Sequence, residues 1–551
     1  MLVFSVRLGD GAITGADAAG PGIVAGMTDI SPQYPLEKDE RLSRCMLWRL
    51  QRTFFAAQGI EAWRQGIVPH YITSNAFIAD AYARVVAAYL GERLALLKDA
   101  GQPVHILELG AGSGKFASLF LKRLSALTRR MGPAAPAWKL VVTDLADRNV
   151  AFWRDHPGLR PFVERGVLDF ARFDVENDRE ITLVESGETI GPRTLVNGLV
   201  VLGNYFFDGI PIDVFQIEGG NLLEGAVTVS SSQQEPDLDD PAVLGRVSLA
   251  FTHRPTMAEG YYDDPAFNKI LQTYQERLGN TSVHFPIAGL RICKLLREWS
   301  GGHMLMLTGD KGYIRDEDLL DKSEPGLAIH GSFSMSVDYH AIGAYFRGAG
   351  GQVFEPRHRH DSLLSVGFLL GAHPDGHRAT RDAFADAIGE FGPDEFFGVA
   401  QMYEKVPEGA TVAQLLSLIH LGRSDPRLLG KCIPALNELV GSASSREKLE
   451  IYQAIEQAWF LYFHLGDDDD IPFEFGRLLY RMDYYPEALQ YFSRSIELYG
   501  ENPHTRFNMS LCYFYLHQRD EALNCVAKTL ALNPNHQGAK GLRIEIQAWT
   551  R

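Results

Sequence analysis

The sequence predicts an α/β protein: a parallel sheet covered by helices, followed by an all-helical region. Near-continuous apolar stretches alternate with helical patterns between about residues 104 and 370. Strands of this kind belong to parallel sheets, because helices cover both of their faces. Beyond about residue 375 the strand pattern stops and helical periodicity takes over.

The composition narrows the class of function. The chain has 551 residues, enough for roughly two to four domains, and a formal net charge of −16. This acidity disfavours nucleic acid as a partner. No stretch approaches the roughly 20 apolar residues of a membrane helix, so we expect no membrane partner. The five cysteines form no CxxC pair, which favours reduced thiols in the cytoplasm over disulfides or a zinc site.

We expect four regions along the chain. Residues 1–70 form an N-terminal helical extension, and residues 71–375 form the sheet domain. Within that domain a Gly-, Ser- and Asp-rich stretch at about 217–300 interrupts the alternation, and an insert after a strand end can cap a ligand site. Residues 376–450 form a helical linker region, and residues 451–551 form helical repeats.

Local patterns predict the elements within these regions. Residues 42–59 (LSRCMLWRLQRTFFAAQG) read as an amphipathic helix, and a long helix begins at Ser74, a plausible N-cap. The final strand pair, QVFEP and LLSVGFLLG, reads as a hairpin at the sheet edge. His358 and His360 lie two apart, as metal ligands on a strand can, but no further Cys or His cluster accompanies them. We therefore interpret them as part of a solvated turn and expect no metal.

The last hundred residues contain an internal repeat. PEALQYFSRSIELYGENP and DEALNCVAKTLALNPN place Ala488 and Ala522 34 residues apart. This period, the small residue and the closing prolines Pro503 and Pro534 resemble the tetratricopeptide family of paired helices. Ala454 is a further 34 residues back in a weaker unit. Because two clear repeats are few, we expect them to stack on the helices before them; a generic helical bundle is the alternative.

A glycine-rich stretch, VHILELGAGSGKF at residues 104–116, carries most of the functional information. A P-loop is excluded because Leu109 stands where its first glycine belongs and Phe116 follows the lysine. A dinucleotide fingerprint needs Gly-x-Gly-x-x-Gly, and its anionic pyrophosphate would not favour the carboxylate of Glu108 before the loop. A cationic ligand would favour a carboxylate at this position. S-adenosylmethionine carries a sulfonium and an ammonium group, and glycines let the backbone approach it closely.

The segment from Glu108 to Gly114 resembles the first motif of Rossmann-like methyltransferases. The resemblance implies a class I methyltransferase domain and S-adenosyl-L-methionine as cofactor; the alternative is a merely tight strand–helix turn. The cofactor-binding residues that it implies are Glu108, Gly110, Ala111, Gly112, Ser113 and Gly114.

Acids at the ends of the following strands fit the rest of such a cofactor. Its ribose needs a carboxylate after the second strand, where LVVTD supplies Asp144. Its adenine needs an acceptor beyond the third strand, where Asp174 is the candidate and Asp169 the rival. Each acid is alternatively a cap or a turn former, because Asp residues often serve these roles at strand ends.

The fourth strand ends in GNYFFDGIP, where the methyl group faces the acceptor in this fold. We predict Asn204, Tyr205 and Asp208 as catalytic residues. Methyl transfer is an in-line displacement, so the enzyme aligns the nucleophile and removes its proton where necessary. Asn204 would hold the acceptor at the edge of the cofactor site, and Asp208 would orient it or act as a base. The alternative is that Asn204 and Asp208 are caps.

A narrower resemblance covers roughly residues 65–375. The chain resembles the MidA family of S-adenosylmethionine-dependent methyltransferases, which includes a mitochondrial complex I assembly factor that methylates an arginine. The matching segments are YITSNA, GNYFFDGIP, LTGDKGY and AIHGSFSMSVDYH. The resemblance implies that Thr73 and Ser74 border the cofactor, and that Asp310, His330 and Asp338 contact the substrate.

The chain departs from the family pattern at two acids. Asn75 and Ala76 replace Pro-Glu, and Tyr205 replaces the acid after Asn204. Carboxylates are the natural grip for a guanidinium, so these losses weigh against arginine. The leading prediction is methylation of a protein side chain recruited by the repeats. Methylation of a small molecule, such as a carboxylic acid, is the alternative enzyme, and a non-catalytic cofactor-binding scaffold is the alternative of another class.

Overall fold

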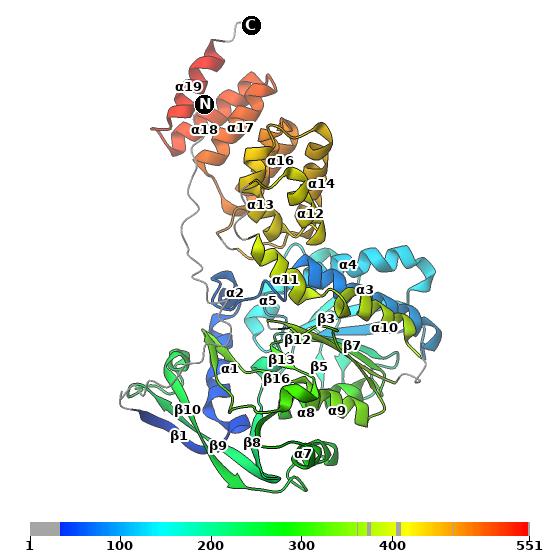
Figure 1. Cartoon of the computed structure of the whole chain (residues 1–551). Coiled ribbons are helices and arrows are strands. Elements are labelled where there is room, and N and C mark those ends of the chain that lie inside the picture. The colour runs from blue at the N-terminus through cyan, green and yellow to red at the C-terminus, as the bar shows by residue number, and fades with distance from the viewer. Residues whose placement is uncertain (1–32, 361, 372–375, 404–408, 467, 549–551) are drawn as a thin grey trace.

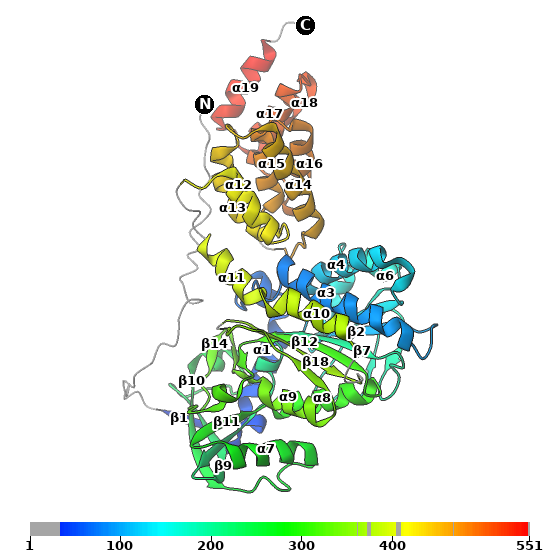
Figure 2. The ribbon, with the colours of Figure 1, turned by 45° about the vertical axis from the view of Figure 1, so that its right-hand side comes forward.

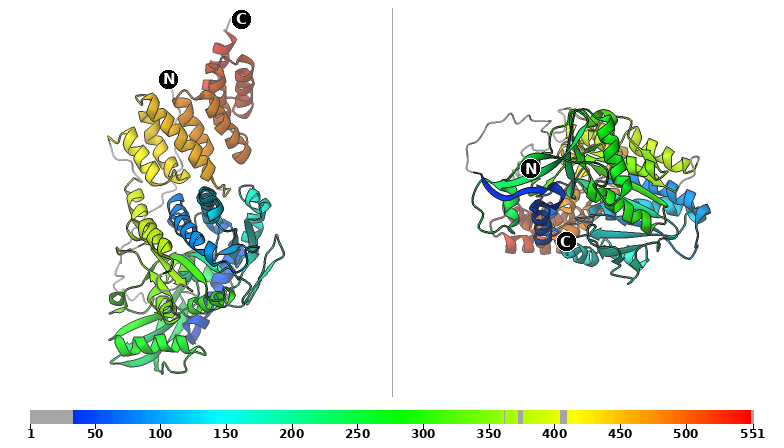
Figure 3. Two further views of the ribbon diagram at one scale, coloured as in Figure 1. Left: turned by 90° about the vertical axis from the view of Figure 1, so that its right-hand side faces the viewer. Right: turned by 90° about the horizontal axis from the view of Figure 1, so that it is seen from below.

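The computed structural model describes residues 33–360, 362–371, 376–403, 409–466 and 468–548. Figure 3 shows a smaller sheet at one end, a larger α/β unit in the middle and a helical tail at the other end. No helix in these described ranges is long and apolar enough to cross a membrane.

A seven-stranded sheet forms the centre of the molecule, in the order β17-β18-β12-β7-β2-β3-β4. Five neighbouring strands, from β12 to β4, run parallel, and β18 runs antiparallel to both β12 and β17. The expected edge hairpin is therefore present. The strands are β2 (Val104–Glu108), β3 (Trp138–Asp144), β4 (Leu168–Arg172), β7 (Leu199–Asn204), β12 (Met304–Asp310), β17 (Gln352–Phe354) and β18 (Leu364–Leu370).

The strand order reverses at β2. The chain moves from β2 to β3 and β4 on one side, then crosses to β7 and β12 on the other side. At such a switch point the loops leave the sheet in opposite directions, so a crevice opens outside the carboxyl ends of the strands. The glycine-rich loop directly follows β2 and lies at this crevice.

Helices cover both faces of the sheet (Figure 2). One core joins the sheet to α3 and α4, and the other joins it to α8 and α9. The N-cap of α3 is Asn75, whose side chain accepts from the backbone N–H groups of Phe77 and Ile78, so Ser74 is not the cap. The helices are α3 (Ala76–Arg93), α4 (Lys115–Met131), α5 (Asp147–Asp155), α6 (Arg160–Glu164), α8 (Ile287–Trp299) and α9 (Tyr339–Gly348).

A second, antiparallel sheet includes most of the strands of the predicted insert. It has the order β1-β9-β8-β11, with β10 paired to β9. Its first strand comes from the described part of the N-terminal extension, so that region is not purely helical; β1 extends an edge of the insert. Its elements are β1 (Tyr34–Arg41), β8 (Asp213–Glu218), β9 (Asn221–Ser231), β10 (Val247–Pro255), β11 (Thr281–Phe285) and the nearby α7 (Pro265–Arg277).

The amphipathic helix expected at residues 42–59 is α1 (Met46–Gln58), and it is followed by the short α2 (Glu61–Arg64). Apolar residues of α1 share a core with the second sheet and with Phe333. Small pairs of strands complete this part of the molecule: β5 (Ile181–Thr182) with β6 (Thr189–Ile190), β13 (Gly312–Tyr313) with β16 (Val337–Asp338), and β14 (Ala328–His330) with β15 (Ser332–Ser334).

The chain beyond residue 375 is helical in its described part (Figure 1). Ala488 in α16 and Ala522 in α18 are fully buried, and Ala454 in α14 is nearly so. The 34-residue register therefore coincides with a repeating packing position. The helices are α10 (Arg378–Phe384), α11 (Pro393–Met402), α12 (Val412–Leu421), α13 (Pro426–Leu439), α14 (Ser445–Leu461), α15 (Ile471–Arg481), α16 (Tyr485–Tyr499), α17 (Pro503–Tyr515), α18 (Arg519–Leu532) and α19 (Gln537–Gln547).

The helical tail is continuous with the α/β unit. One hydrophobic core runs from Phe77 of α3 through the tail helices to Cys525. The ring of Phe77 stacks on Phe396 with 4.6 Å between centroids. The carboxylate of Asp425, at the start of α13, accepts a hydrogen bond from the backbone N–H of Ala76 at 2.9 Å. The repeats thus stack on preceding helices, as expected, and those helices stack on α3.

The turn between β17 and β18 is not simply solvated. The His360 side chain is 3% exposed, with Nδ1 3.5 Å from a carboxylate oxygen of Asp394 and Nε2 3.9 Å from one of Glu395. The start of α11 covers this histidine, which the local sequence could not indicate.

Candidate active site

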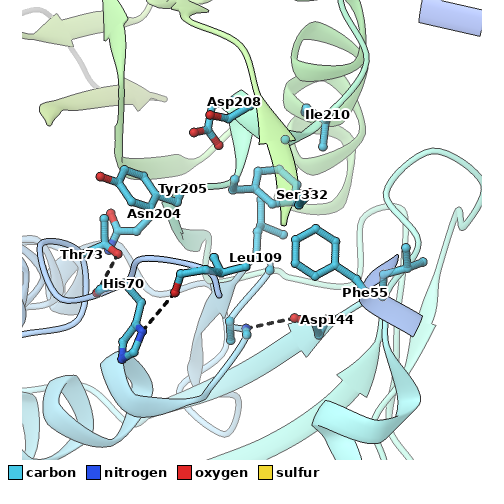
Figure 4. A pocket seen from close by; sticks show the side chains of 18 of the residues that line it. Phe55, His70, Thr73, Leu109, Asp144, Asn204, Tyr205, Asp208, Ile210 and Ser332 are labelled. Atoms are coloured by element: carbon cyan, nitrogen blue, oxygen red, sulfur yellow. Dashed lines mark hydrogen bonds between the residues drawn. The ribbon is translucent and has the colours of Figure 1, made fainter. Parts of the chain in front are cut away.

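A cavity of about 880 Å³ lies at the switch point, outside the carboxyl ends of β2, β3 and β7. Pockets for small ligands span roughly 300–1,000 Å³ in proteins, so this cavity has room for a nucleoside-sized ligand and part of a second molecule. Figure 4 shows Asp144 and Asp208 toward opposite ends of the view, with Asn204 and Tyr205 between them.

The glycine-rich loop needs its glycines for two separate reasons. Gly110, Gly112 and Gly114 have φ values of +58°, +54° and +73°, which other residues rarely adopt. A Cβ on Gly112 would also lie 2.5 Å from Cζ2 of Trp63, so the indole lies directly against the loop. Gly114 is different. A Cβ added at Gly114 would meet Trp153. Gly114 does not line the cavity, whereas Ala111 and Ser113 do.

Glu108 is the distinctive acidic group of the cavity. Its side chain is buried, and its Oε2 atom has no hydrogen-bond partner among the described residues. Burial, with a contribution from neighbouring Asp144, raises the pKa of Glu108 to about 8. Asp144 is itself buried, and it accepts from the backbone N–H groups of Gly112 and Ala146, both at 2.9 Å. Two adjacent carboxylates without a cation among the described residues form a site that fits a positively charged ligand.

The structure separates the two candidates for the adenine acceptor. Asp174 lines the cavity, and both of its oxygens accept from the guanidinium of Arg52 in α1, at 2.7 and 2.9 Å. Asp169 does not line it. Its oxygens accept from the backbone N–H groups of Glu185 and Ser186, so it is a turn former, as the alternative interpretation allowed.

Residues 70–74 form another wall of the cavity. The hydroxyl of Thr73 donates to the carbonyl oxygen of His70 at 3.2 Å, and the hydroxyl of Ser74 donates to the same oxygen. Both residues line the cavity beside the glycine-rich loop. Burial and the nearby Lys115 lower the pKa of His70 to about 3, so its ring is neutral.

Asn204 ends β7 and points its amide into the cavity region. Its Oδ1 accepts from the hydroxyl of Tyr82 at 2.9 Å, while its Nδ2 has no hydrogen-bond partner among the described residues. Tyr205 follows with φ of +49°. A tyrosine in the left-handed region stores backbone strain, which persists where surrounding structure fixes it. The turn after β7 is thus held in a conformation that its own sequence does not favour.

Asp208 lines the cavity at its other end, in the short 3₁₀ helix Phe207–Gly209. Its carboxyl is hydrogen-bonded to that of Asp310 at the end of β12. Burial raises the pKa of Asp208 to about 6, and burial together with Asp208 raises the pKa of Asp310 well above its usual range. The hydroxyl of Tyr339 donates to Asp310. Asp208 and Asp310 thus form a carboxyl pair that holds a proton between them near neutral pH.

Of the three residues expected to contact substrate, the structure places two away from the cavity wall. Asp310 lies behind Asp208 and is fully buried. Asp338 is the N-cap of α9, accepting from the N–H of Ala341 and from the hydroxyl of Tyr274. Neither residue lines the cavity, and the carboxylates of both face protein groups. The backbone of His330 belongs to β14, and its side chain lies outside the described part of the chain.

The elements that cover the cavity differ from the one that the sequence predicted. No residue of the 217–300 insert lines the cavity; α1 and α2 do so instead, through the side chains of Trp48, Gln51, Arg52, Phe55 and Trp63. The insert packs against α1, and Trp63 of α2 lies against the glycine-rich loop. The amphipathic pattern of α1 was visible in the sequence, but the face that it covers depends on tertiary contacts. The tail contributes Gln401 of α11 to the wall.

No family model and no curated protein matches this chain. Among solved structures it is similar to a COG1565 superfamily member from Burkholderia thailandensis bound to S-adenosyl-homocysteine, with 14% identity, a TM-score of 0.35 and coverage of 61% of this chain and 96% of that one. A second COG1565 superfamily protein from the same organism has 15% identity, a TM-score of 0.30 and coverage of 56% and 78%. The tetratricopeptide protein YrrB, described as having an unusual peptide-binding site, has 19% identity, a TM-score of 0.23 and coverage of 30% and 81%.

Proposed function

We propose that this protein is an S-adenosylmethionine-dependent methyltransferase of the MidA-like family. The observation that carries the proposal is the buried carboxylate of Glu108, which has an unpartnered oxygen and lies beside Asp144 at the switch point. An anionic pyrophosphate would add charge of the same sign to this pair. A ligand with a sulfonium and an ammonium group would instead neutralise it, because opposite charge favours ionised carboxylates.

The residues around the loop support such a cofactor. Glu108 would hold its ammonium group, and Asp144 would accept hydrogen bonds from the ribose hydroxyls. Gly110 and Gly112 line the cavity, and a Cβ at either position would lie within 3 Å of the ring of Phe206 or Trp63. Trp63 and Phe55 stack on each other, and both line the cavity as apolar cover.

The chain's own part in the transfer is alignment and proton removal. The bound cofactor would supply an electrophilic methyl group. Asp208, with a pKa of about 6, is mostly ionised at neutral pH and would take a proton from the acceptor. Asp310 keeps its own proton and stabilises the ionised Asp208 by hydrogen bonding. Asn204 would orient the acceptor through its free amide N–H groups, with its oxygen fixed by Tyr82.

For the acceptor, we favour a protein side chain. The tail is made of paired helices of the kind that bind extended peptides, and its first part reaches the cavity through Gln401. A tethered substrate would gain in effective concentration near Asp208. Two features favour the alternative acceptor, a small carboxylic acid. Tyr205 replaces the acid of the family pattern, and α1 covers the cavity.

Two measurements test the proposal on the full chain. Calorimetry should show micromolar binding of S-adenosylmethionine or S-adenosylhomocysteine and no binding of NAD or ATP; the reverse result would overturn the proposal. Radiolabelled S-adenosylmethionine in a lysate of the source organism should then label a protein band. Label confined to small organic-soluble products would establish the small-molecule alternative, and binding with no label in either fraction would establish the scaffold.

A further inference from the structure

Three arginines converge on one carboxylate where α3, α4 and the tail meet, outside the cavity. Asp80 of α3 is 6% exposed. Its Oδ2 accepts from Nε of Arg84 and from Nε of Arg423, both at 2.9 Å, and its Oδ1 lies 3.4 Å from Nε of Arg123. Arg84 belongs to α3, Arg123 to α4, and Arg423 to the turn before α13.

The charges in this cluster do not balance. Within the described ranges, no carboxylate other than Asp80 lies within ion-pair distance of these three guanidinium groups. Burial lowers the pKa of Arg123, Asp80 opposes this shift, and repulsion from Arg423, Arg84 and Arg130 adds to it. A local excess of positive charge is unusual in a protein of net charge −16, because its acidic residues outnumber its basic ones.

The geometry leaves donors free for a second anion. All three arginines face Asp80 with Nε, and no hydrogen bond from their terminal nitrogens is present in the described part of the chain. The Nε of Arg123 has no hydrogen-bond partner there either. The side chains of Arg84, Arg423 and Arg123 are 51%, 34% and 23% exposed, so solvent reaches the cluster. Planar guanidinium groups bind tetrahedral oxyanions through paired N–H donors.

We propose that Arg84, Arg123 and Arg423 form a binding site for a phosphoryl group. The site is separate from the proposed methyl-transfer cavity and does not depend on that function. Arg423 lies two residues before Asp425, whose carboxylate accepts a hydrogen bond from the backbone N–H of Ala76 at the start of α3. A ligand held by all three arginines would therefore bridge the tail, the helix that begins beside Thr73 and Ser74, and the helix that follows the glycine-rich loop. Binding should stabilise the docked tail.

The test is a calorimetric titration of the full chain with inorganic phosphate, at ionic strength held constant with chloride. We expect saturable binding that is weakened about ten-fold or more in Arg123→Gln, the size expected for a lost charged hydrogen bond. Arg84→Gln should give a similar loss and, because its side chain is half exposed, should fold normally. Arg446→Gln, in an exposed pair with Glu450, is the matched control and should bind as the wild type does.

A further variant has the opposite expected sign. Asp80→Asn removes the negative charge and should tighten phosphate binding, whereas loss of a purely structural network would not. The proposal is overturned if phosphate up to about 10 mM gives no saturable binding, or if both arginine variants bind like the control. O-phosphoserine and adenosine monophosphate distinguish the source of the phosphoryl group: tighter binding than phosphate indicates a phosphorylated molecule, and weaker binding indicates the free ion.

Discussion

The two ends of the cavity are built in different ways. At the cofactor end, Glu108 and the glycines are neighbours in the sequence, and Asp144 ends the adjacent strand. At the acceptor end, Asp208 depends on Asp310 and Tyr339, which come from distant parts of the chain. The first end is specified by local sequence and the second by tertiary packing. Substitutions at the two ends should therefore separate cofactor binding from turnover.

The largest expected effect is at the glycine-rich loop. Gly112→Val should abolish binding of S-adenosylmethionine in calorimetry, because the new side chain meets Trp63 and the backbone has φ of +54°. Gly219→Val is a matched control: its φ is +55°, and a Cβ there has no neighbour within 4 Å. If both variants lose binding equally, general destabilisation is the cause and the close approach at Gly112 is not.

The next effect concerns turnover alone. Asp208→Asn should lower methyl transfer by about 10²–10⁴-fold, the usual contribution of a general base, while cofactor affinity stays within a few-fold. Asn204→Ala should act in the same direction. Steady-state rates and calorimetry on the same preparations provide the measurement, with exposed Asp147→Asn as the control. Equal loss of affinity and turnover would mean that these residues are structural.

Asp144 offers an intermediate effect at the cofactor end. Asp144→Ala should weaken cofactor binding by about 1–3 kcal/mol, because it removes charge-assisted hydrogen bonds to the ribose. The same change releases the N–H of Gly112, so the melting temperature should be measured alongside affinity. A fall in stability without any loss of affinity would show that Asp144 only shapes the loop.

The smallest effect is a dependence of cofactor affinity on pH. Because burial raises the pKa of Glu108 to about 8, the cofactor-free protein holds this proton at neutral pH. A cationic cofactor favours the ionised form, so affinity should rise by up to about ten-fold per pH unit until about pH 8 and then level off. Calorimetry in buffers of different ionisation enthalpy should detect the released proton, and Glu108→Gln should remove the slope.

The same carboxyl affects the stability of the cofactor-free protein. Its pKa is higher in the folded state than its ordinary value of 4.5. Its contribution to the free energy of unfolding is therefore fully present below pH 4.5 and is lost as the pH rises towards 8. Denaturant titrations across this range, compared with Glu108→Gln, provide the measurement.

Sequence reasoning reached the parts of the site that local chemistry determines. The parallel sheet and its edge hairpin followed from apolar runs, and the loop, Asp144 and Asn204 followed from their order along the strands. The N-cap was misplaced by one residue, because Ser74 and Asn75 are both good caps and only packing decides between them. The cover of the cavity by Arg52 and Trp63 could not be predicted from the sequence, since nothing local fixes where α1 and α2 pack.

The acceptor end shows the other limit. Asp310 and Asp338 were both expected to contact substrate. Asp310 is instead hydrogen-bonded to the carboxyl of Asp208, and Asp338 is the N-cap of α9. An acid that binds a ligand and an acid that binds a neighbouring acid look alike in a sequence. Only the burial of both partners distinguishes them.

The stack of Phe77 on Phe396 has a consequence for how this protein can be divided. A chain ending near residue 390 would expose the Phe77 ring to water and leave the N–H of Ala76 without Asp425. Both defects fall on the first turn of α3, next to Thr73 and Ser74 in the cavity wall. The tail is therefore not a detachable module. A graft, a shortened variant or an exchange of repeats has to keep α11, α12 and the start of α13 attached to the α/β unit.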